Sequence, residues 1–359
     1  MSKNVKIKQK FKELIIHIGP GKCGSSSIQG FIKNKKNKNY YFELLDPVVI
    51  KNINDNKILN EYENHFKSIF SKYKKIILSH ECLGRCLLCI LFICKLAFNN
   101  NFKIKIIGYS RTCSSYLQSS YCQWYFRNKW VCKENNKILL ENNIMPKIFN
   151  GLEIYFIAGV LVNFKKKIID IISWFKLYKS LKNLVSNYNV IIIPGMIPNS
   201  KNKFCLISDF CKKAKIIVNN KEKKNMVRGN KMYNKKLIEA TRIANLKGTF
   251  NFHPHLNNKF FLESSKILNK KYPNEIDSKF LKYLKSYTDN FFYEDNKKFC
   301  NEFNLKPEYF EGTKINFKEI IEIIHNEQTE RLKSPLKFDH NIEHEWLLKL
   351  IKEKIINNP

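Results

Sequence analysis

A glycine-rich segment near the beginning of the sequence combines one lysine with three consecutive serines in a spacing suited to binding phosphate. The apolar run Leu14–Ile18 is followed by Gly19-Pro-Gly-Lys-Cys-Gly24, and then by Ser25, Ser26 and Ser27. Glycines let the backbone turn sharply and approach an anion, and the N-terminus of a helix offers backbone N–H groups and the positive end of its dipole. The segment therefore predicts a strand, a phosphate-binding loop and a helix.

The position of the lysine separates this loop from the loop of nucleotide triphosphatases. In their G-x-x-x-x-G-K-[ST] pattern the lysine directly follows the last glycine. Here Gly19 and Gly24 have the same separation, but Ser25 follows Gly24 and Lys22 stands before it. The position of Lys22 before Gly24 therefore favours a phosphate-binding loop of a different kind from that of the nucleotide triphosphatases. A P-loop kinase or triphosphatase, with Glu81 as the acid that holds magnesium, stays an alternative.

A second candidate anion site follows the segment Phe102–Ser110, which is rich in β-branched residues and predicts a strand. Arg111 comes directly after this segment, and Ser119 lies eight residues further on. A guanidinium is a planar, permanently charged fork that matches a phosphate, and a serine hydroxyl adds one more hydrogen bond. The two residues together predict a phosphate contact at the end of the strand.

A candidate proton acceptor lies between these two sites. The apolar segment Lys74–Leu78 ends in Ser79, His80 and Glu81. Transfer of a group to an alcohol requires a base that takes the hydroxyl proton, and a carboxylate or an imidazole can serve. Successive strand residues point to opposite faces, so at most one of His80 and Glu81 is expected to face the site. The sequence leaves open whether the base is Glu81, His80 or neither.

These segments together resemble the PAPS-dependent sulfotransferases, where PAPS is 3′-phosphoadenosine 5′-phosphosulfate. The loop Lys22-Cys-Gly-Ser-Ser-Ser27 resembles the family's 5′-phosphosulfate loop, Lys-[Ser/Thr]-Gly-[Ser/Thr]-[Ser/Thr], and the preceding His17-Ile-Gly19 resembles the bacterial and Golgi-type carbohydrate branch. The pair Arg111 and Ser119 matches the family's 3′-phosphate residues. Cys23 departs from the family's usual Ser or Thr. Specific motifs cover residues 1–130, and the resemblance continues weakly to about residue 305.

The resemblance implies a role for each matching residue. The 5′-phosphosulfate would be held by Gly21, Lys22, Cys23, Gly24, Ser25, Ser26 and Ser27. Arg111 and Ser119 would bind the 3′-phosphate, Lys22 would stabilise charge on the bridging oxygen, and Glu81 or His80 would be the base. The products would be adenosine 3′,5′-bisphosphate and a sulfated hydroxyl of a glycan or glycolipid. The resemblance implies no metal ion.

A further arginine could contact the same donor. Arg228, followed by Gly229, resembles the Arg-x-Gly loop with which other sulfotransferases hold the 3′-phosphate. A solvated turn is the alternative interpretation of this segment.

The resemblance also implies an α/β fold, a three-layer sandwich of the P-loop-like sulfotransferase type with a central parallel sheet and a helical C-terminal part. We expect one sulfotransferase domain over 1–305 and a helical extension over 306–359 packed on it. Further elements are predicted as an amphipathic helix over 168–185, a strand over 190–194, and helices over 204–214, 235–246, 260–269, 278–292, 316–325 and 343–356.

The composition sets limits on partners and compartment. The formal net charge is +33, which is typical of proteins that bind polyanions, but the excess is mostly scattered lysine and A/T-rich codons explain much of it. No specific nucleic-acid partner is therefore expected, although a basic nucleic-acid-binding protein stays an alternative. The 11 cysteines and the charged first residues predict free thiols in a reducing cytoplasm. The sequence leaves the oligomeric state open.

One apolar run carries a cluster of cysteines that could suggest zinc. Cys86 and Cys89 have the spacing of a ligand pair, and Cys82 and Cys94 lie beside them. No second pair of cysteines or histidines follows at the distance that zinc sites use. We therefore expect buried cysteines of a helix, and the run is too short to span a bilayer.

Overall fold

The computed structural model describes residues 12–19, 21–35, 39–164, 173–198, 204–219, 222, 233–248, 258–271, 277–306 and 314–333. The chain divides into two compact units, each assembled from separate stretches of sequence. The sheet unit comprises Met1–Arg111, Ser173–Asn230 and Asp295–Tyr309, and the helical unit comprises Thr112–Ile172, Lys231–Glu294 and Phe310–Pro359. The expected domain boundary at residue 305 stays a prediction.

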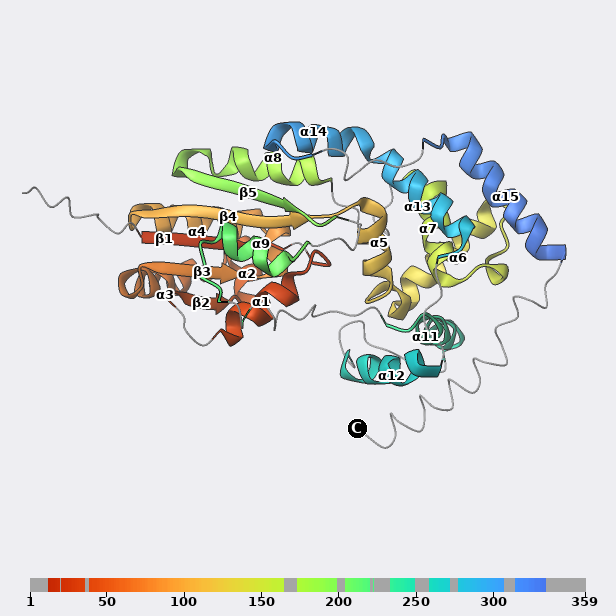
Figure 1. Ribbon diagram of the computed structural model, residues 1–359, viewed down its shortest axis with the longest axis horizontal. Helices are drawn as coiled ribbons and strands as arrows, with labels where there is room; N and C mark the ends of the chain where they lie inside the picture. Colours follow the sequence, from red (N-terminus) through yellow and green to blue (C-terminus); the bar gives the residue numbers. More distant parts are fainter. Residues whose placement is uncertain are drawn as a thin grey trace, which may run out of the picture. The chain divides into compact units, whose positions relative to one another are not determined.

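The sheet unit is built on five parallel strands in the order β2-β3-β1-β4-β5 (Figure 1). The strands are β1 (Lys12–His17), β2 (Tyr41–Leu44), β3 (Lys75–Ser79), β4 (Phe102–Ser110) and β5 (Val190–Met196). The central strand β1 pairs with β3 and β4, and His17 at its end lies opposite Ser79 and Ile107. The predicted α/β class with a parallel sheet is confirmed.

Burial explains why the central strands form. Leu14, Ile15 and Ile16 of β1 are all fully buried, as are Ile76, Ile77 and Leu78 of β3. Strands of a parallel sheet are covered on both faces, so continuous apolar runs suit them better than alternating ones. The same runs made these strands recognisable in the sequence.

Helices of the sheet unit form two packed groups. The helices are α1 (Ser25–Asn34), α2 (Pro47–Asn54), α3 (Leu59–Lys72), α4 (Leu87–Asn99), α8 (Trp174–Leu184), α9 (Leu206–Lys213) and α14 (Tyr293–Phe303). Helix α1 packs against α9, and α4 packs against α2, α3 and α8. Two helix groups around one sheet are consistent with a three-layer α/β arrangement.

Several predicted elements have other bounds in the structure. The helix predicted over 168–185 is α8, which begins at Trp174, and its residues before 173 lie outside the described part. The predicted strand over 190–194 continues to Met196. The prediction of buried cysteines is correct for Cys89 and Cys94 of α4. It is wrong for Cys82, which is exposed and lies on a 3-10 helix before α4.

The described residues of the helical unit form helices and no strand. They include α5 (Cys113–Tyr121), α6 (Lys129–Glu141), α7 (Gly151–Leu161), α11 (Lys235–Lys247), α12 (Asn258–Lys271), α13 (Lys279–Phe291) and α15 (Phe317–Lys333). Every residue of α7 from Gly151 to Val160 is buried, so this helix forms the core of the unit. Helix α15 is longer than predicted, and the predicted helix over 343–356 lies outside the described residues.

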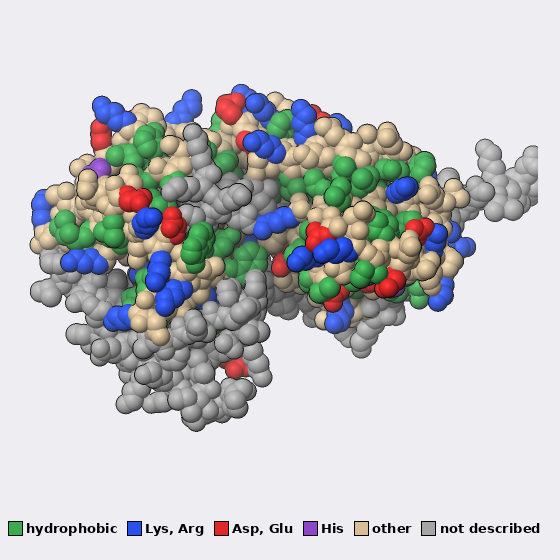
Figure 2. All heavy atoms as spheres, turned by 180° about the vertical axis from the view of Figure 1, so that it is seen from behind, with side chains coloured by type: hydrophobic (Ala, Val, Ile, Leu, Met, Phe, Trp, Pro, Cys, Tyr) green, Lys and Arg blue, Asp and Glu red, His purple; other side chains and the backbone are tan. Residues whose placement is uncertain are grey.

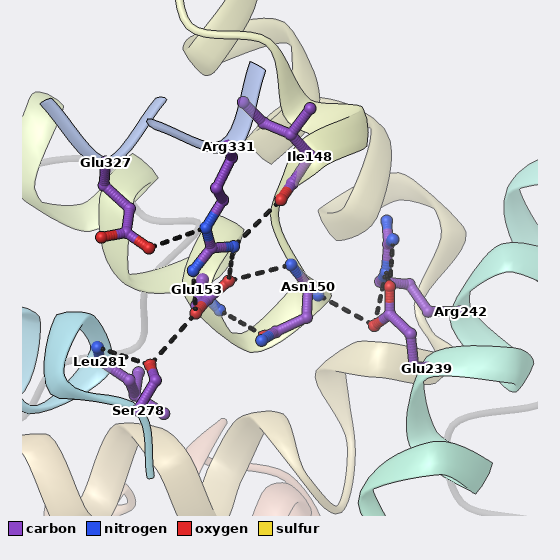
Figure 3. Close-up of polar contacts among 10 residues, drawn as sticks. Ile148, Asn150, Glu153, Glu239, Arg242, Ser278, Leu281, Glu327 and Arg331 are labelled. Carbon is purple, nitrogen blue, oxygen red and sulfur yellow. Dashed lines mark hydrogen bonds and ion pairs between the residues drawn. The ribbon is translucent and has the colours of Figure 1, made fainter. Parts of the chain in front are cut away.

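Two carboxylates occupy the N-terminus of α7 (Figure 3). The Glu153 side chain accepts a hydrogen bond from the backbone N–H of Asn150, and the Asn150 side chain accepts one from the Glu153 N–H. The Gly151 N–H donates to Glu239 over 2.9 Å. A helix N-terminus has unpaired N–H groups and a positive dipole end, so it favours these negative charges.

Each of these carboxylates is paired with an arginine, Glu153 with one from another helix and Glu239 with one from its own helix. Arg331 of α15 donates to Glu153 over 2.8 Å, and Arg242 of α11 pairs with Glu239. Ion pairing raises the pKa of Arg331 despite its partial burial. The buried pair of Arg331 with Glu153 ties α15 to the start of α7, and the hydrogen bond from the Gly151 N–H to Glu239 ties α11 to it.

The described surface and helices can be compared with what polyanion binding and membrane insertion require. On the face shown in Figure 2, the described Lys and Arg side chains are scattered among hydrophobic and acidic ones and do not form one continuous patch. Among the described helices, none has the length and apolar character needed to cross a membrane.

Removing the Arg331 charge should leave the Glu153 carboxylate buried without its partner. We therefore expect Arg331→Met to lower the free energy of unfolding by about 3–5 kcal/mol. Urea denaturation followed by circular dichroism measures this change. The matched control is Lys333→Met, because Lys333 pairs with Glu330 on the surface and such pairs contribute about 0–1 kcal/mol. Equal effects of the two substitutions would contradict the role given to Arg331.

Candidate functional site

Three predicted site segments follow three neighbouring strands of the sheet. The glycine-rich loop follows β1, His80 and Glu81 follow β3, and Arg111 follows β4. Because β3, β1 and β4 are adjacent and parallel, their carboxyl ends meet at one edge of the sheet. This edge is where open α/β sheets bind their ligands. The structure therefore brings these segments together.

The loop after β1 has a backbone shape that requires glycine. Gly19 has a φ of 75°, in the left-handed region that other residues avoid. A Cβ on Gly19 would lie 2.8 Å from the Cα of Glu81, so a side chain would also collide with the segment after β3. The Tyr109 N–H donates to the Gly19 carbonyl over 3.1 Å. The loop is thus in contact with the ends of both neighbouring strands.

Helix α1 begins directly behind this loop. Gly24 precedes it in a left-handed conformation, and no side chain caps the helix. Ser25 is buried, Ser26 is exposed and Ser27 is partly buried. The first turn carries no acidic residue, in contrast to α7, whose start holds two carboxylates. The start of α1 is therefore a positive helix end without an acidic side chain of its own.

Arg111 joins the two predicted anion sites within the sheet unit. Its Nη1 donates a hydrogen bond to the backbone carbonyl of Lys22 over 3.0 Å. The carbonyl of Arg111 accepts a hydrogen bond from the indole Nε1 of Trp174 over 2.9 Å. The strand end that carries Arg111 is therefore held next to the phosphate-type loop.

The charge of Arg111 has no acidic partner in the described part of the chain. Its Nε atom is buried and makes no hydrogen bond there. Burial lowers the pKa of Arg111, and no described carboxylate opposes this shift. Burying a charge is costly unless it is paired. Arg242 and Arg331, by contrast, each have a carboxylate. An anionic ligand would supply the charge that Arg111 lacks.

Cys23 cannot supply this negative charge. The side chain is buried in the loop, and burial raises the pKa of its thiol to about 12 although the positive charge of Arg111 opposes the shift. The thiol is therefore neutral near pH 7. A neutral Cys23 therefore does not offset the positive charge of Arg111.

His80 and Glu81 differ in what their side chains contact. The His80 Nδ1 accepts a hydrogen bond from the backbone N–H of Cys82 over 3.0 Å, so the ring proton of the neutral form is assigned to Nε2. Burial lowers the pKa of His80. The Glu81 carboxylate is partly buried and accepts no hydrogen bond from the residues that the structure describes.

Strand alternation does not decide which of these two side chains faces the site, contrary to the prediction. Alternation requires β3 to continue through both residues, whereas β3 ends at Ser79. His80 caps a 3-10 helix that begins at Glu81, so strand alternation does not apply to them. The two side chains differ instead in their hydrogen bonds, since His80 accepts one from the Cys82 N–H and Glu81 accepts none from the described residues.

Sequence reasoning missed the polar contact beneath the loop. His17, at the end of β1, is fully buried, and its Nδ1 lies 2.8 Å from the Ser79 Oγ. The Gln29 side chain of α1 donates to the same Ser79 Oγ over 3.1 Å. These contacts join β1, β3 and α1. The signal in the sequence was a histidine within an otherwise apolar strand.

Other predicted site residues are not brought to this edge by the described structure. Ser119 lies on α5 in the helical unit and is partly buried. Arg228 lies outside the described residues. Their contacts with a donor stay predictions. Within the described residues, no group of three or more His, Cys, Asp or Glu side chains is placed to hold a metal ion.

Comparison with known proteins does not assign the chain to a family. No family model, no curated protein and no solved structure matches it. The residues of the candidate site are therefore the basis for inferring a function.

The burial of His17 predicts a pH dependence of stability. Burial lowers the pKa of His17 from 6.5 to about 3. Between these values the unfolded chain binds a proton that the folded chain does not, so stability falls as the pH is lowered. One such proton changes the free energy of unfolding by up to about 1.4 kcal/mol per pH unit.

Urea denaturation between pH 6.5 and pH 4 measures this dependence. His17→Asn should reduce the slope of unfolding free energy against pH by close to one proton. The control is His65→Asn, which removes a histidine on the surface. An unchanged slope in His17→Asn would show that His17 does not titrate as its burial requires.

Proposed function

We propose that the protein is a PAPS-dependent sulfotransferase with a P-loop-like sulfotransferase fold. It moves a sulfuryl group from PAPS to a hydroxyl of a glycan or glycolipid. The observation that supports this most is the hydrogen bond from Arg111 to the Lys22 carbonyl. It joins the two segments that the family uses for opposite ends of its donor. The preference for a carbohydrate acceptor rests on the resemblance alone.

The proposed reaction is an in-line displacement at sulfur. The acceptor oxygen forms a bond to sulfur while the bond from sulfur to the bridging phosphate oxygen breaks, and adenosine 3′,5′-bisphosphate leaves. Lys22 stabilises the charge that develops on that oxygen, and residues 24–27 bind the 5′-phosphate. Arg111 binds the 3′-phosphate, so the donor is held at both ends, and the resemblance alone implies a further contact of this phosphate with Ser119.

Glu81 is the better candidate for the base. It takes the proton of the acceptor hydroxyl as the bond to sulfur forms. Its carboxylate accepts no hydrogen bond from the described residues, so both oxygens can accept a proton. In His80 the acceptor nitrogen already receives the Cys82 N–H, and the other nitrogen carries the proton. His80 would have to change its hydrogen bonding before acting as a base.

Donor binding tests the proposal against its rivals. We expect adenosine 3′,5′-bisphosphate to bind without magnesium, because Lys22 and Arg111 supply the positive charge. Arg111→Ala should weaken this binding more than tenfold, since a hydrogen bond to a charged group contributes about 1.5–3 kcal/mol. Ser119→Ala should weaken it less. Isothermal titration calorimetry measures both effects.

Two other binding results would favour the alternative functions. Binding of ATP only with magnesium, and no binding of the bisphosphate, would favour a kinase or triphosphatase. Salt-sensitive binding of nucleic acid that is indifferent to Arg111→Ala would favour a nucleic-acid-binding protein.

Turnover tests the assignment of the base. With radiolabelled PAPS and a panel of glycans, Glu81→Gln should lower the rate about 10²–10⁴-fold, because general base catalysis is lost. The affinity for adenosine 3′,5′-bisphosphate should change little. His80→Asn is the matched control, since asparagine can still accept the Cys82 N–H. If Glu81→Gln retains full turnover, Glu81 is not the base.

A further inference from the structure

A chain of two hydrogen bonds connects helix α8 to the glycine-rich loop. The indole Nε1 of Trp174 donates to the Arg111 carbonyl over 2.9 Å, and the Arg111 guanidinium donates to the Lys22 carbonyl over 3.0 Å. All three residues belong to the sheet unit. Trp174 is fully buried, so its N–H cannot exchange this partner for water. The loop is therefore linked through Arg111 to the packed core.

The loop needs such a link because of its backbone at Lys22. This residue has a φ of 68°, in the left-handed region, where a residue with a side chain is disfavoured by about 1–2 kcal/mol. Asn and Asp occur in this region more often than other residues with a side chain, because their short polar side chains can hydrogen-bond locally. The hydrogen bond from Arg111 to the Lys22 carbonyl offsets this cost and favours the observed conformation.

We propose that Arg111 holds residues 21–24 of the glycine-rich loop in their observed conformation through the Lys22 carbonyl, and that Trp174 is the positioning residue that sets Arg111 in place. This role is separate from the contact of Arg111 with a 3′-phosphate. The statement that the loop receives a phosphate rests on the proposed function, whereas the conformation of the loop does not.

Cys23 reports on this loop conformation without any ligand. It is the next residue after Lys22, its side chain is 1% exposed, and burial raises the pKa of its thiol to about 12. A buried neutral thiol reacts slowly with alkylating agents, which attack the thiolate. If the loop opens, the thiol gains access to solvent and its pKa falls towards the ordinary value. Its alkylation then accelerates.

Pulse alkylation with iodoacetamide, followed by mass spectrometry of the peptides, measures the rate at each cysteine. Arg111→Met removes the hydrogen bond to Lys22 and keeps an unbranched side chain. Trp174→Phe removes the indole N–H and keeps an aromatic ring. Two cysteines of the same unit serve as internal references. Cys82 is exposed and labels freely, and Cys94 is fully buried in α4 and reports unfolding of the unit.

We expect Cys23 to label at least tenfold faster in Arg111→Met, and severalfold faster in Trp174→Phe, while Cys94 stays protected. Trp130→Phe is the control for a tryptophan substitution, because Trp130 is 61% exposed, and it should leave labelling unchanged. Unchanged labelling of Cys23 in both variants overturns the proposal. Equal acceleration at Cys23 and Cys94 also overturns it, since the variants then act by unfolding.

Nucleotide binding separates this inference from the proposed function. The probe is 5′-AMP, which has no 3′-phosphate for Arg111 to contact. If Arg111 holds the loop, Arg111→Met and Trp174→Phe each weaken 5′-AMP binding about threefold or more. Unchanged 5′-AMP affinity in both variants, with weaker binding of adenosine 3′,5′-bisphosphate in Arg111→Met, contradicts the role in the loop and leaves the sulfotransferase proposal standing. If Cys23 labels faster in the variants but the protein binds neither nucleotide, the role of Arg111 in the loop is supported and the sulfotransferase proposal is contradicted.

Discussion

The charge of Arg111, which has no carboxylate partner among the described residues, is the constraint on which the candidate site depends. A guanidinium removed from water has to be compensated by hydrogen bonds or by an anion. The carbonyl of Lys22 supplies one hydrogen bond, and Trp174 fixes the strand end behind it. Because one carbonyl cannot neutralise a full charge, the Arg111 guanidinium stays positive at this edge of the sheet. This property makes the site suited to an anion rather than to a neutral ligand.

The starts of α7 and α1 differ in whether acidic side chains occupy them. In the helical unit, Glu153 and Glu239 occupy the start of α7, and each is neutralised by an arginine. The start of α7 thus binds side chains of the protein itself, which stabilises the helix and occupies the N–H groups that a ligand would need. In the sheet unit, the start of α1 has no acidic residue in its first turn, and an arginine lies beside its loop. The chain therefore uses the same electrostatics to stabilise one helix and to prepare the other for a ligand.

Local patterns made part of this architecture predictable. The apolar runs of β1 and β4 and the glycines after β1 are encoded within a few residues, so the strand ends and the loop could be located from the sequence. The contacts of His17 with Ser79, and of Trp174 with Arg111, join segments far apart in the chain, so local patterns do not identify the partners. The end of β3 at Ser79 was also missed, because the apolar pattern does not mark the point at which a strand changes into a 3-10 helix.

The most direct test of the central claim is a crystal structure of the protein with adenosine 3′,5′-bisphosphate bound. The account predicts one phosphate against the backbone of residues 24–27 and the other within hydrogen-bond distance of the Arg111 guanidinium. A nucleotide bound away from this sheet edge, or an Arg111 side chain that contacts neither phosphate, would contradict it.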